Sequence, residues 1–216
     1  MVQISAARRP ISRDSRDKIL DRKREILDAA SRVFRRRGLA ATGMRDIAAE
    51  LGMAVGNLYY YFKDKEELLA FVQEDALAGL LEIAAAVRAT DLRADAKLFR
   101  LIEEHVVRLN EGTPGSLAHL EVEALGETWR REVQERRDEY ERAFRDLLEE
   151  GMAAGVFRTV DSKVSALAIL GAVNWTVKWF RPEGRKSARE IGREQAELLV
   201  RGVLAPGIEM ERAWTT

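Results

Sequence analysis

The sequence predicts an all-α protein of about nine helices, with a three-helix N-terminal head and a larger helical bundle after it. The 216 residues include only 4 prolines, and long windows are rich in Ala, Leu, Glu and Arg, which are good helix formers. Apolar residues make up 46% of the chain, which is enough for a sizeable core. Apolar residues recur at helical spacing, and no strand-like alternation accompanies them.

The head is predicted from three helical segments in succession. The first runs from about residue 17 to 37, where apolar residues form one stripe and Gly38 follows three arginines in the last turn. The second starts at Thr42 or Gly43 and buries residues such as Ile47. Gly52 provides the turn, because glycine adopts a positive φ without steric cost. The third helix spans residues 55–62.

Capping signals place the helices of the bundle. Asp64 with Glu67 forms a capping box that opens a helix through about residue 87, and Asp91 is expected to start the next, to about residue 110. A Thr-Pro-Gly break precedes a short helix at about 116–126 and a long one at about 128–153. Asp161 begins a helix that ends at residues 181–184. Ser187 with Glu190 opens the last helix, which runs to about residue 204.

The net charge of zero hides a strong asymmetry. Residues 1–65 hold 15 Lys and Arg against 8 Asp and Glu, and residues 66–216 hold 21 against 28. A basic head on an acidic body is typical of a protein that binds a polyanion through one part of its chain. We therefore expect nucleic acid as a partner.

Composition also excludes several classes of protein. The chain has no cysteine, so it has neither disulfides nor thiolate metal sites. It has no signal-peptide pattern and no long apolar run, so we expect a cytoplasmic protein without membrane contact. The chain has two histidines and no Gly-rich phosphate loop. A di-iron Glu-x-x-His motif ending at His105 would need a glutamate at position 102, where the chain has Ile102. We therefore expect no enzyme, no cofactor and no metal.

The second and third segments have the spacing of a helix-turn-helix, in which the second helix of the pair enters the major groove of DNA. Three consecutive tyrosines on so short a helix cannot all face a core. Leu58 and Phe62 are expected to point inward. Arg45 is able to reach guanine or hold a phosphate, and lysines flank the next helix start. The residues predicted to contact DNA are Arg45, Val55, Gly56, Asn57, Tyr59, Tyr61, Lys63 and Lys65.

Residues 26–69 resemble the DNA-binding head of TetR-family transcriptional regulators. The matching features include Ile26-Leu-Asp-Ala-Ala30, Phe34, Gly38, Thr42, Arg45-Asp-Ile-Ala48, Leu51-Gly52, Gly56-Asn-Leu-Tyr-Tyr-Tyr-Phe62 and Lys65-Glu-Glu-Leu68. The resemblance implies about nine helices with a divergent C-terminal ligand and dimerisation domain, and it adds Thr42 as a phosphate contact. The chain has Ala54-Val55 where many relatives have Ser or Lys before the glycine.

The resemblance divides the chain into four parts and implies a function. The parts are a flexible basic arm (1–16), a helix-turn-helix DNA-binding domain (17–65), an effector-binding and dimerisation domain (66–207) and a tail (208–216). The implied function is that of a repressor that a small effector releases from a palindromic operator. The repressor acts as a homodimer that joins through its last two helices.

The effector is predicted from a shorter resemblance. Residues 171–182 resemble the penultimate helix of TetR-family regulators that sense acyl-CoA thioesters of fatty-acid or aromatic-acid catabolism. Trp175 and Trp179 lie one turn apart on one face, where they line either a pocket or only the dimer core. The effector-binding residues are predicted to be His105, Trp129, Arg130, Asn174, Trp175 and Trp179. Alternatives are a hydrophobic drug-like effector, a core role for His105, and an adaptor that does not bind DNA.

Overall fold

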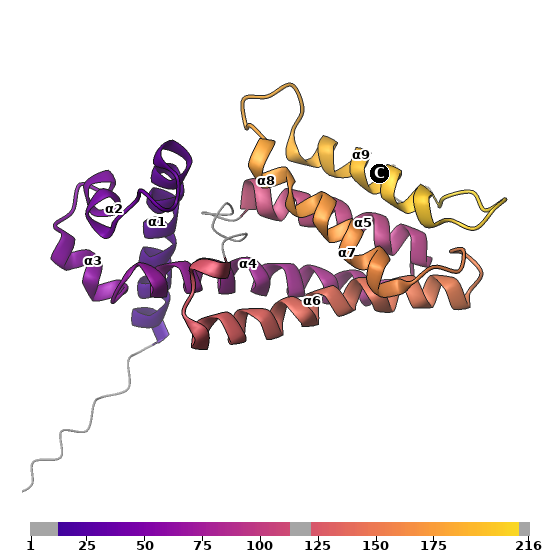
Figure 1. Ribbon diagram of the computed structural model, residues 1–216, viewed down its shortest axis with the longest axis horizontal. Coiled ribbons are helices and arrows are strands. Elements are labelled where there is room, and N and C mark those ends of the chain that lie inside the picture. Colours follow the sequence, from indigo (N-terminus) through magenta and orange to yellow (C-terminus); the bar gives the residue numbers. More distant parts are fainter. Residues whose placement is uncertain (1–12, 113–121, 212–216) are drawn as a thin grey trace, which may run out of the picture.

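The structure is a computed structural model, and it describes residues 13–112 and 122–211. These residues form an all-α fold, as predicted (Figure 1). The helices are α1 (Arg13–Arg37), α2 (Met44–Glu50), α3 (Val55–Tyr61), α4 (Lys65–Arg88), α5 (Ala94–Val107), α6 (Glu127–Ala153), α7 (Ser162–Asn174), α8 (Thr176–Trp179) and α9 (Ala188–Val203).

Helices α1 to α3 form the head around their own small core. Side chains from all three helices and from the first turns of α4 are buried in it, among them Ile26, Phe34, Ile47, Leu58 and Phe62. The turns into α2 and α3 use Gly38 and Gly52, whose φ angles of 80° and 63° favour glycine. The predicted head is therefore confirmed helix by helix.

Helix α4 leaves the head and runs along the body beside α6 (Figure 1). It begins as predicted, because the Asp64 carboxylate accepts the Glu67 N–H at 2.8 Å. The body core joins α4, α5, α6, α7 and α9. Helices α5 and α9 lie especially close, since a Cβ added at Gly192 would be 3.0 Å from the carbonyl oxygen of Glu103.

The predicted helix from Asp161 to residue 181 is wrong in its second half, because the structure breaks it at Trp175 into α7 and α8. Thr176 explains the break. Its hydroxyl donates to the carbonyl of Val173 at 2.7 Å and accepts from the Asn110 amide at 2.8 Å. A threonine hydroxyl that bonds back to its own helix loosens the regular backbone ladder.

Asn110 changes the end of the preceding helix in the same way. The predicted helix through residue 110 is α-helical only to Val107, and Arg108–Gly112 form a π-helical turn. The Asn110 amide donates to the carbonyl of Val106 at 2.8 Å. A side chain inserted into the backbone ladder widens the turn.

Other boundaries differ from the prediction by a few residues. Helix α1 begins at Arg13, so the last four residues of the predicted arm are helical; the rest of the arm lies outside the described residues. Helix α5 has Arg93 at its N-cap, not Asp91. The short helix predicted at 116–126 falls mostly outside the described residues, and its described end is a 3-10 turn at Val122–Ala124. The tail begins against α5, where the Glu211 N–H donates to Asp95 at 2.7 Å.

Two helix glycines give a matched test of this packing. A Cβ at Gly151 would come within 3.0 Å of the buried Phe157 ring, whereas one at Gly202 in α9 would have nothing within 4 Å. We expect Gly151→Ala to lose about 1–3 kcal/mol of unfolding free energy through overpacking. Gly202→Ala should be neutral or gain up to about 1 kcal/mol from helix propensity. Thermal unfolding followed by circular dichroism checks both, and equal melting temperatures would contradict the packing at Gly151.

Within residues 13–112 and 122–211, no helix is long and apolar enough to cross a membrane.

Candidate DNA-binding surface and effector cavity

Only a few inward-facing side chains anchor α3 in the head. Leu58 and Phe62 are completely buried in the head, as predicted. Val55 and Tyr61 are half-buried and pack against the same core. Because α3 has seven residues, these contacts leave its other face open to solvent.

The open surface carries most of the predicted DNA-binding residues. Gly56, Asn57 and Tyr59 are exposed on α3, and Tyr59 keeps half of its surface in solvent. Arg45 and Lys63 are exposed beside them. These side chains provide an amide, a phenol and two cations, which are the groups that bind phosphates and base edges.

Two predicted DNA-binding residues are engaged inside the head. Thr42 is only 2% exposed, and its hydroxyl donates to the Gly38 carbonyl at 2.8 Å, so it closes the end of α1 and does not face solvent. The Lys65 ammonium donates to the carbonyl of Leu39, and partial burial lowers its pKa. Sequence reasoning left out Tyr60, which at 76% exposure is the most exposed aromatic of α3.

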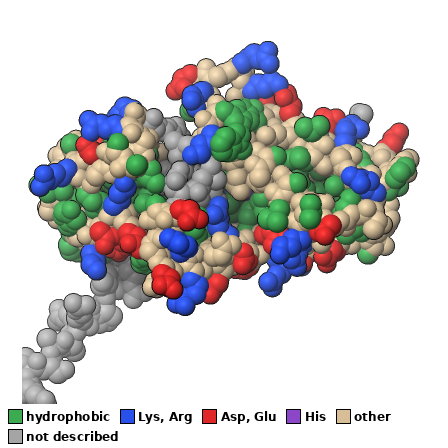
Figure 2. All heavy atoms as spheres, viewed as in Figure 1, with side chains coloured by type: hydrophobic (Ala, Val, Ile, Leu, Met, Phe, Trp, Pro, Cys, Tyr) green, Lys and Arg blue, Asp and Glu red, His purple; other side chains and the backbone are tan. Residues whose placement is uncertain are grey.

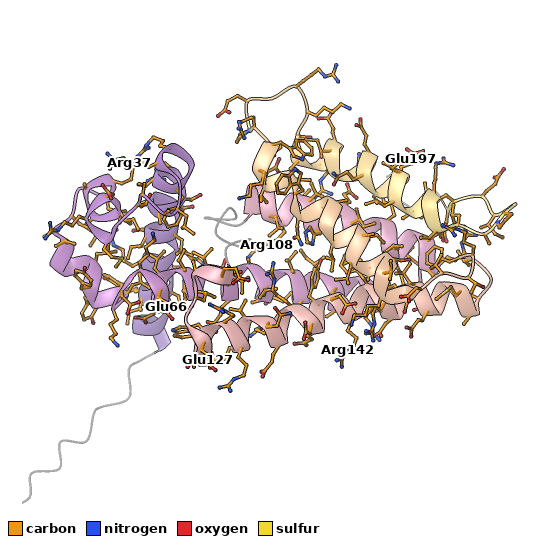
Figure 3. All side chains as sticks on the ribbon, viewed as in Figure 1. Arg37, Glu66, Arg108, Glu127, Arg142 and Glu197 are labelled. Atoms are coloured by element: carbon orange, nitrogen blue, oxygen red, sulfur yellow. The ribbon has the colours of Figure 1, made fainter. Side chains whose placement is uncertain are left out.

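Ion pairs bind α1 to α2. Glu50 accepts hydrogen bonds from Arg36 and Arg32, which lower the pKa of its carboxyl group to about 2. Arg37, labelled in Figure 3, pairs with Asp46. The same Asp46 accepts the N–H of Gly43 at 2.8 Å and caps α2. The acidic side chains of α2 therefore hold cations of α1, whereas Arg45 is exposed to solvent.

The head contacts the body through Asp75 on α4. Its carboxylate lies 3.7 Å from Arg24 of α1 and 3.3 Å from Arg108 of the π-helical turn. Arg108 also donates to the Asp75 carbonyl at 3.1 Å, and it crosses α4 where Gly79 leaves space (Figure 3). One carboxylate thus joins the DNA-binding head to the end of α5.

A cavity of about 520 Å³ lies in the body between α6 and α7. Its floor is buried and consists of Leu77, His105 and Tyr140. Its rim is charged and carries four cations against two anions. The charged lining residues are Arg137, Asp138, Glu141, Arg142 and Arg145 of α6 and Lys163 of α7. Arg142 extends outward from α6 in Figure 3, and Figure 2 shows Lys and Arg side chains interspersed with Asp and Glu over this helix.

Three side chains form a hydrogen-bonded chain at the floor. The ring nitrogens of His105 lie 3.0 Å from the Tyr140 hydroxyl and 3.2 Å from Oδ1 of Asn174. Burial lowers the pKa of His105 to about 4, an effect that the Asn174 contact partly opposes. Burial also raises the pKa of Tyr140. The floor is therefore neutral and polar at pH 7.

One wall of the cavity holds an ion pair whose facing atoms make no hydrogen bond. Nε of Arg145 and Oε1 of Glu141 are buried and form this ion pair at 3.9 Å, and neither atom has a hydrogen-bond partner among the described residues. Buried polar atoms without partners are rare in native proteins. One N–H donor and one carboxylate acceptor at this spacing complement an amide group of a ligand.

The structure brings together only two of the six residues predicted to bind the effector, His105 and Asn174. Trp129 packs against the head core, and Arg130 donates to backbone carbonyls at 123 and 125. Trp175 is 60% exposed and does not line the cavity. Trp179 lines a separate groove between α8 and α9. Tyr140 and the charged residues of α6 that line the cavity are not among the residues predicted from the sequence. The available signal was their spacing of three and four residues along a helix that faces the core.

Two family descriptions match the chain. Residues 26–72 match "Bacterial regulatory proteins, tetR family", and residues 91–203 match "Tetracyclin repressor-like, C-terminal domain". The chain is 28% identical over 185 residues to the HTH-type transcriptional repressor KstR2 of Mycolicibacterium smegmatis, covering 84% of this chain and 90% of that protein.

Solved structures give the same result. The TetR-family regulator PfmR of Thermus thermophilus superposes with a TM-score of 0.75 at 32% identity, covering 82% of this chain and 97% of PfmR. AibR in complex with isovaleryl coenzyme A and operator DNA superposes with a TM-score of 0.71 at 26% identity, covering 83% and 98%. Relatives that are transcriptional repressors confirm the prediction that the chain is not an enzyme. The chain belongs to the TetR family of bacterial transcriptional regulators.

Proposed function

We propose that this regulator is a repressor which binds a palindromic operator as a homodimer and leaves it when an acyl-CoA thioester occupies the cavity between α6 and α7. The exposed residues Asn57 and Tyr59 of α3, together with Arg45 of α2, supply the DNA contacts. The similarity to KstR2, a repressor, and to AibR, which binds isovaleryl coenzyme A and operator DNA, supports this function. Such a protein acts in the cytoplasm, where operator DNA lies.

The chemistry of the cavity is the observation that carries the effector class. Coenzyme A combines phosphates with a pantetheine arm that contains amides. The cations of the rim, such as Arg142 and Lys163, suit the phosphates. The Arg145 donor and the Glu141 acceptor, which make no hydrogen bond, suit an amide. A hydrophobic drug without polar groups would leave both atoms without a hydrogen bond, which costs free energy.

The cavity has a physical connection to the head. Asn174 ends α7 at the cavity, and the next residues form the break in which Thr176 accepts from Asn110. Asn110 belongs to the same π-helical turn as Arg108, which holds Asp75. A ligand that moves the end of α7 therefore acts on the carboxylate that contacts the head. The cavity and the DNA-binding surface are then two separate sites that share one connecting element, and each site influences the position of that element, as allosteric coupling requires.

Helices α7 to α9 carry the surface proposed for the dimer. Large hydrophobic side chains are exposed there, and Figure 2 shows them on the upper part of the molecule. Exposed apolar patches of this kind mark protein–protein contacts. The residues are Val164, Leu167, Trp175, Trp179 and Leu198.

A thermal-shift screen combined with a DNA gel-shift assay tests the effector class. The purified protein is screened with acyl-CoAs of graded chain length, phenylacetyl-CoA and the corresponding free acids. We expect at least one thioester to raise the melting temperature and to release the protein from its own upstream DNA. No shift with any thioester would exclude this class and leave the repressor assignment intact.

A pair of variants separates cavity binding from general charge effects. Arg145→Met removes the N–H donor and should weaken the active thioester at least tenfold. Arg22→Met removes an arginine that pairs with Glu25 on the surface of α1, away from the cavity, and it should leave thioester affinity unchanged. Equal affinity in the wild type and Arg145→Met would contradict the proposed binding mode.

A further inference from the structure

The floor of the cavity contains a polar group that a plain hydrocarbon chain would not need. His105, Tyr140 and Asn174 come from three different helices, α5, α6 and α7, and meet at the deepest part of the cavity. His105 is 1% exposed and Tyr140 3% exposed. The methyl end of a bound fatty acyl chain would lie against these three polar side chains. Burying a methyl group there contributes little binding free energy.

The donors and acceptors of these three side chains fix the direction of the hydrogen bonds between them. A neutral imidazole has one donor and one acceptor nitrogen. If Nε2 carries the proton, it donates to Oδ1 of Asn174, and the Tyr140 hydroxyl donates to Nδ1. If Nδ1 carried the proton, it would donate to the Tyr140 oxygen and leave the buried hydroxyl hydrogen without an acceptor among the described residues. The first arrangement satisfies every buried group.

This direction decides what Asn174 offers to a ligand. Its Oδ1 accepts from His105, so its amide nitrogen is left to donate, and no described residue accepts from that nitrogen. Asn174 is half-buried and lines the cavity. The floor therefore presents a neutral N–H donor to the occupant, and the complementary group is an oxygen acceptor without a proton, such as a carbonyl.

We propose that Asn174 determines effector specificity by donating a hydrogen bond to a carbonyl oxygen on the acyl group, beyond the thioester, and that Tyr140 and His105 position its amide for this role. The effector is then an oxo-acyl thioester. Only the thioester in this assignment rests on the proposed function. The hydrogen bond to the carbonyl depends on the side chains of the floor, so a free oxo acid would make it as well.

Matched ligand pairs test the proposal by isothermal titration of the full-length protein. Each pair differs by one carbonyl: 4-oxopentanoyl-CoA with pentanoyl-CoA, 7-oxooctanoyl-CoA with octanoyl-CoA, and the four corresponding free acids. We expect the oxo member to bind at least tenfold more tightly in at least one pair, because an analogue that lacks the carbonyl leaves the Asn174 donor unpaired in the occupied cavity. A preference among the free acids alone would exclude the thioester and keep the carbonyl contact. No preference in any pair overturns the proposal.

Tyr140→Phe tests positioning separately from structure. The variant keeps the ring and removes only the hydroxyl that fixes the proton of His105. We expect the oxo preference, measured as the ratio of the two affinities within a pair, to fall to below about threefold, whatever change both members share. Loss of affinity for both members in equal proportion would indicate a merely structural role.

Nitrogen NMR of histidine gives a readout that needs no ligand. The chain has two histidines, so His119→Gln leaves the His105 signals alone. At pH 7 we expect a neutral ring with the proton on Nε2, and a mixture of tautomers in Tyr140→Phe. A proton on Nδ1 in the wild type would make the Asn174 oxygen face the cavity and overturn the proposal.

Discussion

Replacing Arg45 and Tyr59 together by alanine is expected to lower operator affinity about 100-fold, since each lost contact to a base or phosphate costs about 1–3 kcal/mol. Arg45 is exposed at the start of α2, and Tyr59 is half-exposed on α3. Neither side chain belongs to the head core. Fluorescence anisotropy with the upstream operator fragment measures the loss at a fixed salt concentration, because phosphate contacts make affinity depend on salt.

The fold of this double variant should be unchanged, with a melting temperature within a few degrees of the wild type. Arg88→Gln, at the far end of α4, is a suitable control for removing a positive charge far from the head. Undiminished operator binding by the double variant would mean that the exposed face of α3 does not enter the groove. A similar loss with Tyr60→Ala would extend the contact surface to the tyrosine that sequence reasoning left out.

The head was predictable because its signals are local. Gly38, Gly52 and the Asp64 cap act within a few residues of themselves, and each lies where the structure turns or starts a helix. The direction of Leu58 and Phe62 also followed from helical periodicity. What periodicity could not show is that Thr42 would use its hydroxyl on Gly38, since that depends on how α1 meets α2.

The body was harder to predict because its deciding contacts connect distant parts of the chain. The break at Trp175 depends on a hydrogen bond between Asn110 and Thr176, which lie 66 residues apart. Nothing in the local sequence of either helix specifies that contact. Strong helix formers on both sides favour a continuous helix, and tertiary contacts override this propensity.

The residues that line the cavity could be predicted only in part, for the same reason. His105 and Asn174 are among the residues that the sequence predicts to bind the effector, whereas Tyr140 is not, because a tyrosine on a helix normally belongs to a core. Trp129 was assigned to the pocket by residue type, and the structure places it against the head. Sequence identifies which side chains carry chemistry, whereas packing decides which of them meet.

Placing a charge on the exposed face of α7 to α9 is the second change with a large expected effect. Trp175 and Leu198 are 60% and 72% exposed, so Trp175→Glu with Leu198→Glu should leave the subunit folded. The proposed dimer buries these side chains, and burying unpaired carboxylates there is strongly unfavourable. We expect the double variant to be a monomer by analytical ultracentrifugation and to lose at least about 100-fold in operator affinity, because linked half-site binding is lost.

Ile208→Glu is the matched control, since Ile208 is an exposed hydrophobic residue outside α7 to α9. It should remain dimeric and bind the operator normally. The pair of variants also resolves the two roles predicted for Trp175. A monomer that still binds the active thioester assigns Trp175 to the dimer face alone, whereas an intact dimer that no longer binds it would place the tryptophan at the effector and move the dimer contact elsewhere.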